Sequence, residues 1–328
     1  MDTGTHFVIG VGLAGLAQLD PAVSASTTTS IAVLIGTVLG SQAPDFDGLL
    51  RLKGNAVYIK NHRGLSHSLP AILLWTVLIS GGLALFFTGL PIVNITLWVF
   101  AAVCFHVFTD LFNSYGTQAM RPFSEKWIAW NIIHIFDPFI FFSHLAAIFA
   151  WVMKLAPPTV LFPGLYALIA LYYVWRSVVH YRLEKSLPEH DPYRLPNDHY
   201  YALPTVHLNQ WNIVKSHGDG AYTLGEWKNN QLQWLDSVKC MSHPAITASK
   251  SHPSVASFLY FSSFACAEVK EYEWGYEVRW ADVRYRHRKQ YPFVAVLRLN
   301  KNLKPIDSYV GWVSDSRLEK KLRIDSLS

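Results

Sequence analysis

The chain has 328 residues, a length that predicts two domains. Hydrophobic residues make up 51% of it and charged residues only 16%, against about 25% charged residues in ordinary soluble domains, which argues against a wholly soluble protein. The net charge of +5 does not indicate a nucleic-acid partner, because much of the positive charge lies in loops beside apolar segments, where orientation in a membrane explains it.

A membrane-spanning helix needs about 20 mainly apolar residues. Apolar runs follow one another along the first half of the chain: Phe7–Leu19, Ile31–Leu39, Leu69–Leu90, Ile92–Phe108, Phe139–Met153 and Thr159–Trp175. The first two are short and rich in Gly and Ala, residues that let membrane helices approach closely. We therefore expect a mainly α membrane helical bundle of about six helices, two of them short, at residues 1–186.

Basic residues favour one side of this predicted bundle. If the apolar runs alternate in direction, the loops at 42–67 and 113–136 and the C-terminal region share one membrane face. That face carries Arg51, Lys53, Lys60, Arg63, Arg121, Lys126, Arg176, Arg182 and Lys185, whereas the opposite face shows only Lys154. The positive-inside rule then predicts a multi-pass protein whose C-terminal domain is cytoplasmic.

Residues 187–328 have a different pattern, with many more charges. Val255–Val269, Tyr276–Tyr285 and Phe293–Leu299 are rich in Val, Tyr, Phe and Trp and partly alternate, and Asn300–Asn302 is a predicted turn. These features predict a small β-rich soluble domain. Three widely spaced cysteines without a Cys-x-x-Cys pair predict neither a zinc ribbon nor a disulfide framework. No sequence feature identifies a protein partner of this domain.

Histidine and aspartate residues gather at the predicted cytoplasmic face. Such side chains in or beside membrane segments are costly and usually functional. Imidazole and carboxylate ligands without cysteine suit zinc, manganese or iron. We therefore expect a divalent metal site for one ion or more, with Zn²⁺ favoured over Mn²⁺ or Fe²⁺. The candidate ligands are His6, Asp45, Asp47, His62, His67, His106, Asp110, His134 and Asp137.

Two features add chemistry to these ligands. His106 and Asp110 are four residues apart and therefore share a helix face. A metal would lower the pKa of bound water and polarise a phosphoryl or carbonyl oxygen. We assign catalytic roles to Arg63, Asp47 and Ser66, with Arg63 holding an anionic group through paired hydrogen bonds. Taken singly, the two aspartates of the 45–47 segment would also suit a loop cap, and Arg63 would also suit a topology determinant.

An ordered series of motifs crosses roughly the first 180 residues: Thr5-His6 with Gly10, Pro44-Asp45-Phe46-Asp47, His62-Arg63-Gly64, Ser66-His67-Ser68, His106 with Asp110, Tyr115-Gly116 with Pro122, and Asp137-Pro138. The series resembles the YdjM-like family of LexA-regulated bacterial inner-membrane proteins, described as metal-dependent hydrolases. The chain looks most like the longer YfhP-type members, which add a soluble C-terminal domain. The resemblance implies hydrolase activity in the bacterial inner membrane and carries over every candidate ligand above except His134, which is added from its proximity.

The leading hypothesis is a membrane-bound hydrolase that acts on a phosphoester or lipid headgroup at the cytoplasmic face. A more distant similarity, to zinc-dependent phospholipase C and P1-type nucleases, implies a zinc cluster and a phosphodiester or phospholipid substrate. An acid-phosphatase-like membrane phosphatase is rejected, because that family expects Arg six residues before the HxxxD histidine and Phe100 stands there. The alternative is a metal-binding regulator or transporter without hydrolase activity. A transporter should place its ligands near the bilayer midplane.

Overall fold

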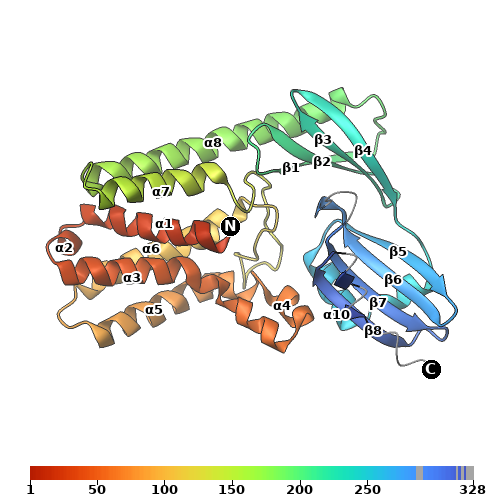
Figure 1. Ribbon diagram of the computed structural model, residues 1–328, viewed down its shortest axis with the longest axis horizontal. Coiled ribbons are helices and arrows are strands. Elements are labelled where there is room, and N and C mark those ends of the chain that lie inside the picture. The colour runs from red at the N-terminus through yellow and green to blue at the C-terminus, as the bar shows by residue number, and fades with distance from the viewer. Residues whose placement is uncertain (286–290, 315–316, 319–320, 323–328) are drawn as a thin grey trace. The chain divides into compact units, whose positions relative to one another are not determined.

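Long helices build the N-terminal part of the computed structural model, which describes residues 1–285, 291–314, 317–318 and 321–322. Figure 1 shows these helices running alongside one another: α1 (Thr3–Leu16), α3 (Thr27–Gln42), α5 (Leu69–Phe86), α6 (Ile92–Leu111), α7 (Pro138–Val152) and α8 (Pro158–His190). Each overlaps one of the predicted apolar runs, so the helical bundle is confirmed. Of the helices in the described residues, α5, α6 and α8 are long and apolar enough to cross a membrane, and α1 and α7 are shorter apolar helices.

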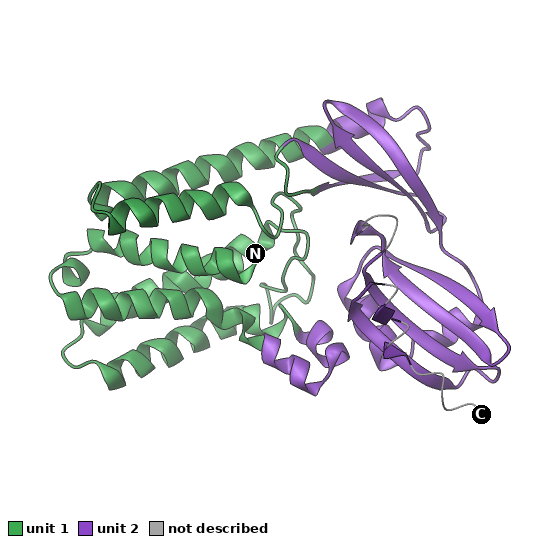
Figure 2. Cartoon of the chain, viewed as in Figure 1, with its two compact units in different colours: residues 1–47, 62–183, 204–208 green, residues 48–61, 184–203, 209–328 purple. Residues whose placement is uncertain are grey.

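Short elements connect the long helices. They are the 3₁₀ helices Ala17–Leu19, Ala43–Lys53 and Leu65–His67 and the short helices α2 (Pro21–Ser24) and α4 (Asn55–Asn61). The chain divides into two compact units, shown in Figure 2: residues 1–47, 62–183 and 204–208 form unit 1, and residues 48–61, 184–203 and 209–328 form unit 2. The segment with α4 therefore belongs to unit 2, although the residues on both sides of it belong to unit 1.

Helix α3 packs against both α1 and α6, and glycines make the close approach possible. A Cβ added to Gly10 of α1 would lie 2.9 Å from Val38 Cα, and one added to Gly40 of α3 would lie 3.1 Å from Val99 O. Small residues at such crossings are the usual way in which membrane helices pack. The absence of side chains at these two positions thus sets the spacing of the helices that carry the site.

Unit 2 contains two four-stranded antiparallel sheets. Their strands follow chain order: β1 (His199–Pro204), β2 (Gln210–Ser216), β3 (Ala221–Lys228) and β4 (Gln231–Lys239), then β5 (Ala265–Tyr272), β6 (Gly275–Asp282), β7 (Phe293–Asn300) and β8 (Pro305–Trp312), with a 3₁₀ helix at Val283–Tyr285. The β-rich character of this part is confirmed. The turn at Asn300–Asn302 is also confirmed, because Asn300 Oδ1 accepts the backbone N–H groups of Asn302 and Lys304.

The predicted strand at Val255–Val269 is wrong over its first half. Residues Pro253–Phe261 form helix α10, after the short helix α9 (Pro244–Ser249), and only the residues from Ala265 onward are a strand. The N-terminus of α10 is set by His252, whose Nδ1 accepts the N–H of Ser254, and by Pro253 in the first turn. Phe258 packs on Phe293 of β7 with ring centroids 5.0 Å apart, and this burial outweighs the β propensity of the segment.

One disulfide, Cys240–Cys266, joins the segment after β4 to β5, and Cys104 is a free cysteine. The cysteine spacing predicted no disulfide framework, and this single bond was not foreseen by that analysis. The two cysteines are 26 residues apart in sequence, but the fold brings their Cα atoms to 5.1 Å, and Met241 N–H donates to Ala267 O beside them. Sequence spacing does not reveal such a pair because tertiary folding creates the proximity.

Candidate metal centre

Four segments of unit 1 bring the candidate ligands to one end of the helices. Helix α1 begins there, with Asp2 accepting the N–H of Thr5 at its N-cap. Helix α3 ends there and continues into the 3₁₀ helix that carries Asp45 and Asp47. Ser68 caps the N-terminus of α5 and thereby fixes the position of His67 directly before it. The last turn of α6 carries Asp110, one turn after His106.

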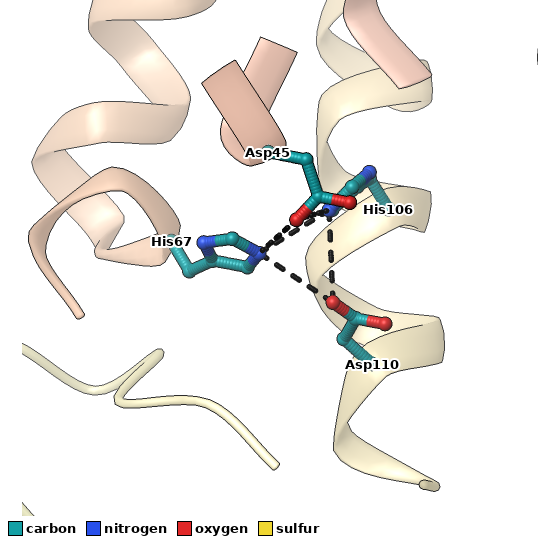
Figure 3. A group of neighbouring side chains, drawn as sticks. All are labelled: Asp45, His67, His106 and Asp110. Carbon is teal, nitrogen blue, oxygen red and sulfur yellow. Dashed lines mark hydrogen bonds and ion pairs between the residues drawn. The ribbon is translucent and has the colours of Figure 1, made fainter. Parts of the chain in front are cut away.

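Four side chains from three of these segments converge, as Figure 3 shows: Asp45, His67, His106 and Asp110. The Nε2 atoms of His67 and His106 are 3.2 Å apart. Asp110 Oδ2 lies 3.4 Å from His67 Nε2 and 3.6 Å from His106 Nε2, and Asp45 Oδ1 lies 3.6 Å and 3.7 Å from the same two nitrogens. Two ligands about 2.0–2.1 Å from one tetrahedral zinc are about 3.3–3.4 Å apart. The spacing of the four atoms therefore fits a single small cation.

The hydrogen bonds behind the two imidazoles show which ring nitrogen carries the proton. His106 Nδ1 lies 2.6 Å from Ser41 O, and a carbonyl only accepts, so Nδ1 carries the hydrogen. His67 Nδ1 lies 2.9 Å from Ser66 Oγ, whose own hydroxyl proton is donated to Asp47 Oδ2 at 2.6 Å. Ser66 must then accept from His67. Both Nε2 atoms consequently direct lone pairs at each other, an arrangement that a cation between them stabilises.

The burial of these side chains also favours a bound cation. His67, His106 and Asp110 are fully buried, whereas the side chain of Asp45 is 19% exposed. Asp45 Oδ1 and Asp110 Oδ2, the two oxygens in the group, have no hydrogen-bond partner among the described residues. Burial, followed by the neighbouring His106, lowers the pKa of His67 well below its usual value, so its ring is neutral and able to bind metal at neutral pH. The four residues thus fit a metal ion, with the open side at Asp45.

Asp47 organises the turn that carries His62, Arg63 and Ser66. Its Oδ1 lies 2.8 Å from His62 Nδ1, and its Oδ2 accepts from the Arg63 backbone N–H at 2.9 Å and from Ser66 Oγ. Asp45, Asp47 and His62 form a second group with metal-ligand spacing. Because three donors already occupy the Asp47 carboxylate, the first group is the better metal site.

Arg63 is almost completely buried, and its guanidinium lies inside the cluster. One of its terminal nitrogens is 3.3 Å from Asp110 Oδ2, and the other donates to Asn113 Oδ1 at 3.2 Å. Its backbone has a positive φ of 59°, which turns the N–H toward Asp47. These contacts give Arg63 a structural role at Asp110, and its binding of a substrate anion remains a prediction.

Asn113 is a site residue that sequence reasoning missed. Its Nδ2 donates to Asp110 Oδ1 at 3.1 Å, and its Oδ1 also accepts the N–H groups of Tyr115 and Gly116. The side chain is fully buried. The available signal was its position three residues after Asp110 in an Asn-Ser-Tyr-Gly turn.

His6 borders the cluster from α1. Its ring stacks on His106 with centroids 3.7 Å apart, and its Nε2 lies 3.3 Å from Asp110 Oδ1. The amino group of Met1 forms an ion pair with the same oxygen and donates to His6 Nε2 at 3.0 Å. Asp110 Oδ1 is therefore in contact with groups on this side, and Oδ2 is the oxygen that faces His67 and His106.

His134 and Asp137 lie outside both metal-ligand groups of the described residues. Asp137 is the N-cap of α7, accepting the N–H groups of Phe139 and Ile140, and its second oxygen accepts from Tyr172 of α8 at 2.7 Å. His134 Nδ1 lies 2.9 Å from Phe136 O in its own loop. Metal binding by these two residues remains a prediction that the geometry does not favour.

The helical part of the chain matches a known family. The family model for the YdjM inner membrane protein covers residues 1–183. The chain belongs to the YdjM family. The model of the YfhP C-terminal alpha/beta plait domain covers residues 244–322. A Bacillus subtilis (strain 168) relative with the description "Uncharacterized protein YfhP" is 42% identical over 333 residues, covering 100% of both chains. No solved structure matches.

Proposed function

We propose that this YdjM-family membrane protein is a metal-dependent hydrolase whose ion is held by Asp45, His67, His106 and Asp110. The observation that carries the proposal is the set of five distances between 3.2 and 3.7 Å that relate their four ligand atoms. A divalent cation at this position supplies Lewis-acid catalysis to a hydrolytic reaction. Nitrogen and carboxylate ligands favour Zn²⁺, with Mn²⁺ or Fe²⁺ as the other candidates.

The surrounding residues hold the ligands rather than react. Ser41 O orients His106. Asp47 orients Ser66 through a hydrogen bond, and Ser66 in turn orients His67. Such outer partners fix the tautomer and direction of a metal-binding histidine. Arg63 and Asn113 hold Asp110. We therefore assign Ser66, Asp47 and Arg63 positioning roles, and we infer that substrate reaches the ion from the Asp45 side, where the cluster is exposed.

The substrate class that we propose is a phosphoester or a lipid headgroup at the membrane surface. The ligands lie at helix ends, beside segments long and apolar enough to span a membrane, so the headgroup region is the accessible source of esters. A metal-binding regulator is the second candidate. The complete burial of His67, His106 and Asp110 favours it, because a purely structural or sensory ion needs no access for substrate.

Elemental analysis of purified protein tests the metal site. We expect bound transition metal in the wild type and a large loss in His106→Ala and in Asp110→Ala, because each substitution removes a ligand. His144→Ala, which removes a buried histidine outside both metal-ligand groups of the described residues, is the matched control and should retain metal. Unchanged metal content in both ligand variants would eliminate the site.

The hydrolase assignment is tested separately with metal-loaded protein. A screen of phosphodiester, phosphomonoester and phospholipid substrates should reveal turnover that the His106→Ala variant lacks. If the wild type binds metal and turns over none of these substrates, the regulator function replaces the hydrolase.

A further inference from the structure

A long apolar cavity lies beside the metal cluster, within the helices of unit 1. Its volume is about 480 Å³, inside the range of roughly 300–1,000 Å³ in which proteins hold small ligands. Along α8 its wall runs from Tyr166 to Val178, and the twelve steps between these residues rise about 18 Å at 1.5 Å per residue. Helices α1, α6 and α7 supply the other walls. The cavity is therefore elongated along the membrane-spanning helices.

The walls carry almost no polar group able to bind a polar ligand. Thr109 Oγ1 donates to His106 O, and Ser177 Oγ donates to Tyr173 O, so both hydroxyl protons are used within their own helices. Tyr166 donates its hydroxyl proton to Ile9 O. Among the lining side chains described, His144 Nε2 is the one buried nitrogen or oxygen without a hydrogen-bond partner. The walls thus suit a hydrocarbon far better than a polar metabolite.

The cavity opens where lipid would surround the protein. Ile140 and Ile9 at its inner wall are buried, whereas Phe108 of α6 and Val174 of α8 are 51% and 62% exposed. Both α6 and α8 are long and apolar enough to span a membrane. The molecules that can enter through such a mouth are the lipids of the bilayer.

A transmembrane helix from another protein fits this cavity less well than a lipid chain does. A helix 18 Å long and 10 Å across occupies roughly 1,400 Å³, about three times the cavity volume. Membrane helices also pack through small residues, whereas the large side chains Phe105, Phe112 and Tyr173 line this wall. A single extended hydrocarbon chain meets both constraints.

The cavity shares two helices with the metal cluster. On α1, Ile9 lines the cavity and His6, one turn earlier, borders Asp110. On α6, Thr109 lines the cavity and the next residue, Asp110, belongs to the cluster. A lipid chain in the cavity would consequently place its polar end near the cluster.

We propose that this cavity holds the hydrocarbon chain of a membrane lipid, and that the lipid so held is the substrate of the metal centre. The substrate class is then an amphipathic lipid ester that is recognised by its chain as well as by its headgroup. The second half of this proposal rests on the hydrolase function above, whereas the binding half stands without it.

Photo-cross-linking tests the binding half. Full-length protein is reconstituted in phosphatidylcholine–phosphatidylglycerol vesicles containing a phospholipid with a diazirine in its acyl chain, and the cross-linked residues are mapped. We expect adducts concentrated on residues 105–112 and 166–178. Ala170→Trp should reduce them about tenfold or more, because each methylene excluded from an apolar site costs a factor of about four. Leu171→Trp, on the 68% exposed neighbour outside the cavity wall, is the matched control.

Ser177→Phe narrows the cavity near the end of the wall at Val178, and it replaces Ala170→Trp in the test if that variant does not fold. Retained metal and an unchanged elution volume identify folded variants. Equal adduct yields in the filled and control variants would overturn the proposal. So would adducts spread evenly over α5, or protein–protein adducts at 166–178 without lipid adducts, which would assign the face to another helix.

Hydrolysis assays separate the two halves. If the substrate half holds, Ala170→Trp should raise the KM for a vesicle phospholipid while leaving turnover of a water-soluble phosphodiester unchanged. Cross-linking as expected without turnover of any ester would remove the hydrolase function and keep the lipid site. Turnover of both substrates unchanged in Ala170→Trp would remove the lipid as the substrate held by this cavity.

Discussion

Several side chains surround the carboxylate of Asp110. Arg63 and His6 lie 3.3 Å from its two oxygens, and Asn113 donates to it at 3.1 Å. A buried carboxylate is tolerated only when it is paired and hydrogen-bonded. These contacts explain how the end of α6 accommodates a fully buried carboxyl group among apolar helices.

Arg63→Lys distinguishes the two roles open to Arg63. Lysine keeps the charge but loses the planar group that reaches Asp110 and Asn113 together. If Arg63 positions Asp110, metal affinity should fall by about 10- to 100-fold, as it does for other outer partners of metal ligands. Metal titration of the purified apoprotein measures this change. Unaltered affinity combined with lower phosphoesterase activity would instead support the binding of a substrate anion.

The pH dependence of metal retention follows from His67. Protons compete with metal for a neutral imidazole, and burial holds the pKa of His67 well below its usual 6.5. Protonation is therefore postponed to more acidic pH, so metal should remain bound as the pH falls through 6.5 and be lost only well below it. Equilibrium dialysis across a pH series measures the retained metal. A midpoint near 6.5 would show that His67 titrates as an exposed histidine and is not a buried ligand.

At the scale of the elements, the crossing of α1 and α3 sets the geometry of the site. Gly10 lies in α1 one turn after His6, and Ser41 lies at the end of α3, where its carbonyl orients His106. A change in the distance between these helices would displace His6 relative to the Ser41 carbonyl that orients His106. The glycine is thus part of the framework of the metal centre, although it contacts no ligand.

Gly10→Ala should lower stability by about 1–3 kcal/mol, the usual cost of overpacking, because the new Cβ would meet the Val38 backbone at 2.9 Å. Thermal unfolding in detergent measures the change, and metal content should fall with it. Gly82→Ala is the matched control: it lies in α5 with nothing within 4 Å of its added Cβ. Removing that glycine should leave stability unchanged or raise it slightly. Equal effects of the two substitutions would contradict the role of the α1–α3 crossing.

At the scale of the whole molecule, unit 2 constrains the topology. The segment 48–61, which lies between Asp47 and His62, belongs to the same compact unit as the sheets. Within that unit Asn55 Nδ2 donates to Val310 O at 3.0 Å. We therefore predict that the loop before α5 and the C-terminal region lie on one side of the membrane.

Reporter fusions after Gly54 and after Asp191 should both report the cytoplasm, as the distribution of basic residues predicts. The Cys240–Cys266 disulfide is the counter-indication, because disulfides are rare in the cytosol. Alkylation of thiols in intact cells, with Cys104 as the internal reference, reports the state of this pair. Fusions on opposite sides would contradict both the charge rule and the shared unit.

Composition and periodicity by themselves predicted a helical membrane bundle followed by a β-rich C-terminal part. Runs of apolar residues are costly to expose in water, so hydropathy alone locates the helices that bury them or face lipid. The same cost drew attention to His106 and Asp110, because ionisable side chains in apolar runs are unfavourable and usually have a function. Strand propensity was a weaker guide: at Pro253–Phe261 the packing of Phe258 on β7 overrode it.

Only the tertiary structure decided which candidate ligands meet. Hydropathy predicts how deep each residue lies in the membrane, but it does not fix the rotation of each helix about its axis. The sequence therefore could not distinguish the roles of Asp45 and Asp47. Asp45 completes the four-residue group, whereas Asp47 hydrogen-bonds the neighbouring turn. The partners that orient the ligands were also invisible, since one is the backbone carbonyl of Ser41 and another, Asn113, has no ligand pattern. The lipid-sized cavity arises from four helices packing around unfilled space, a property of their spacing that no single segment of sequence encodes.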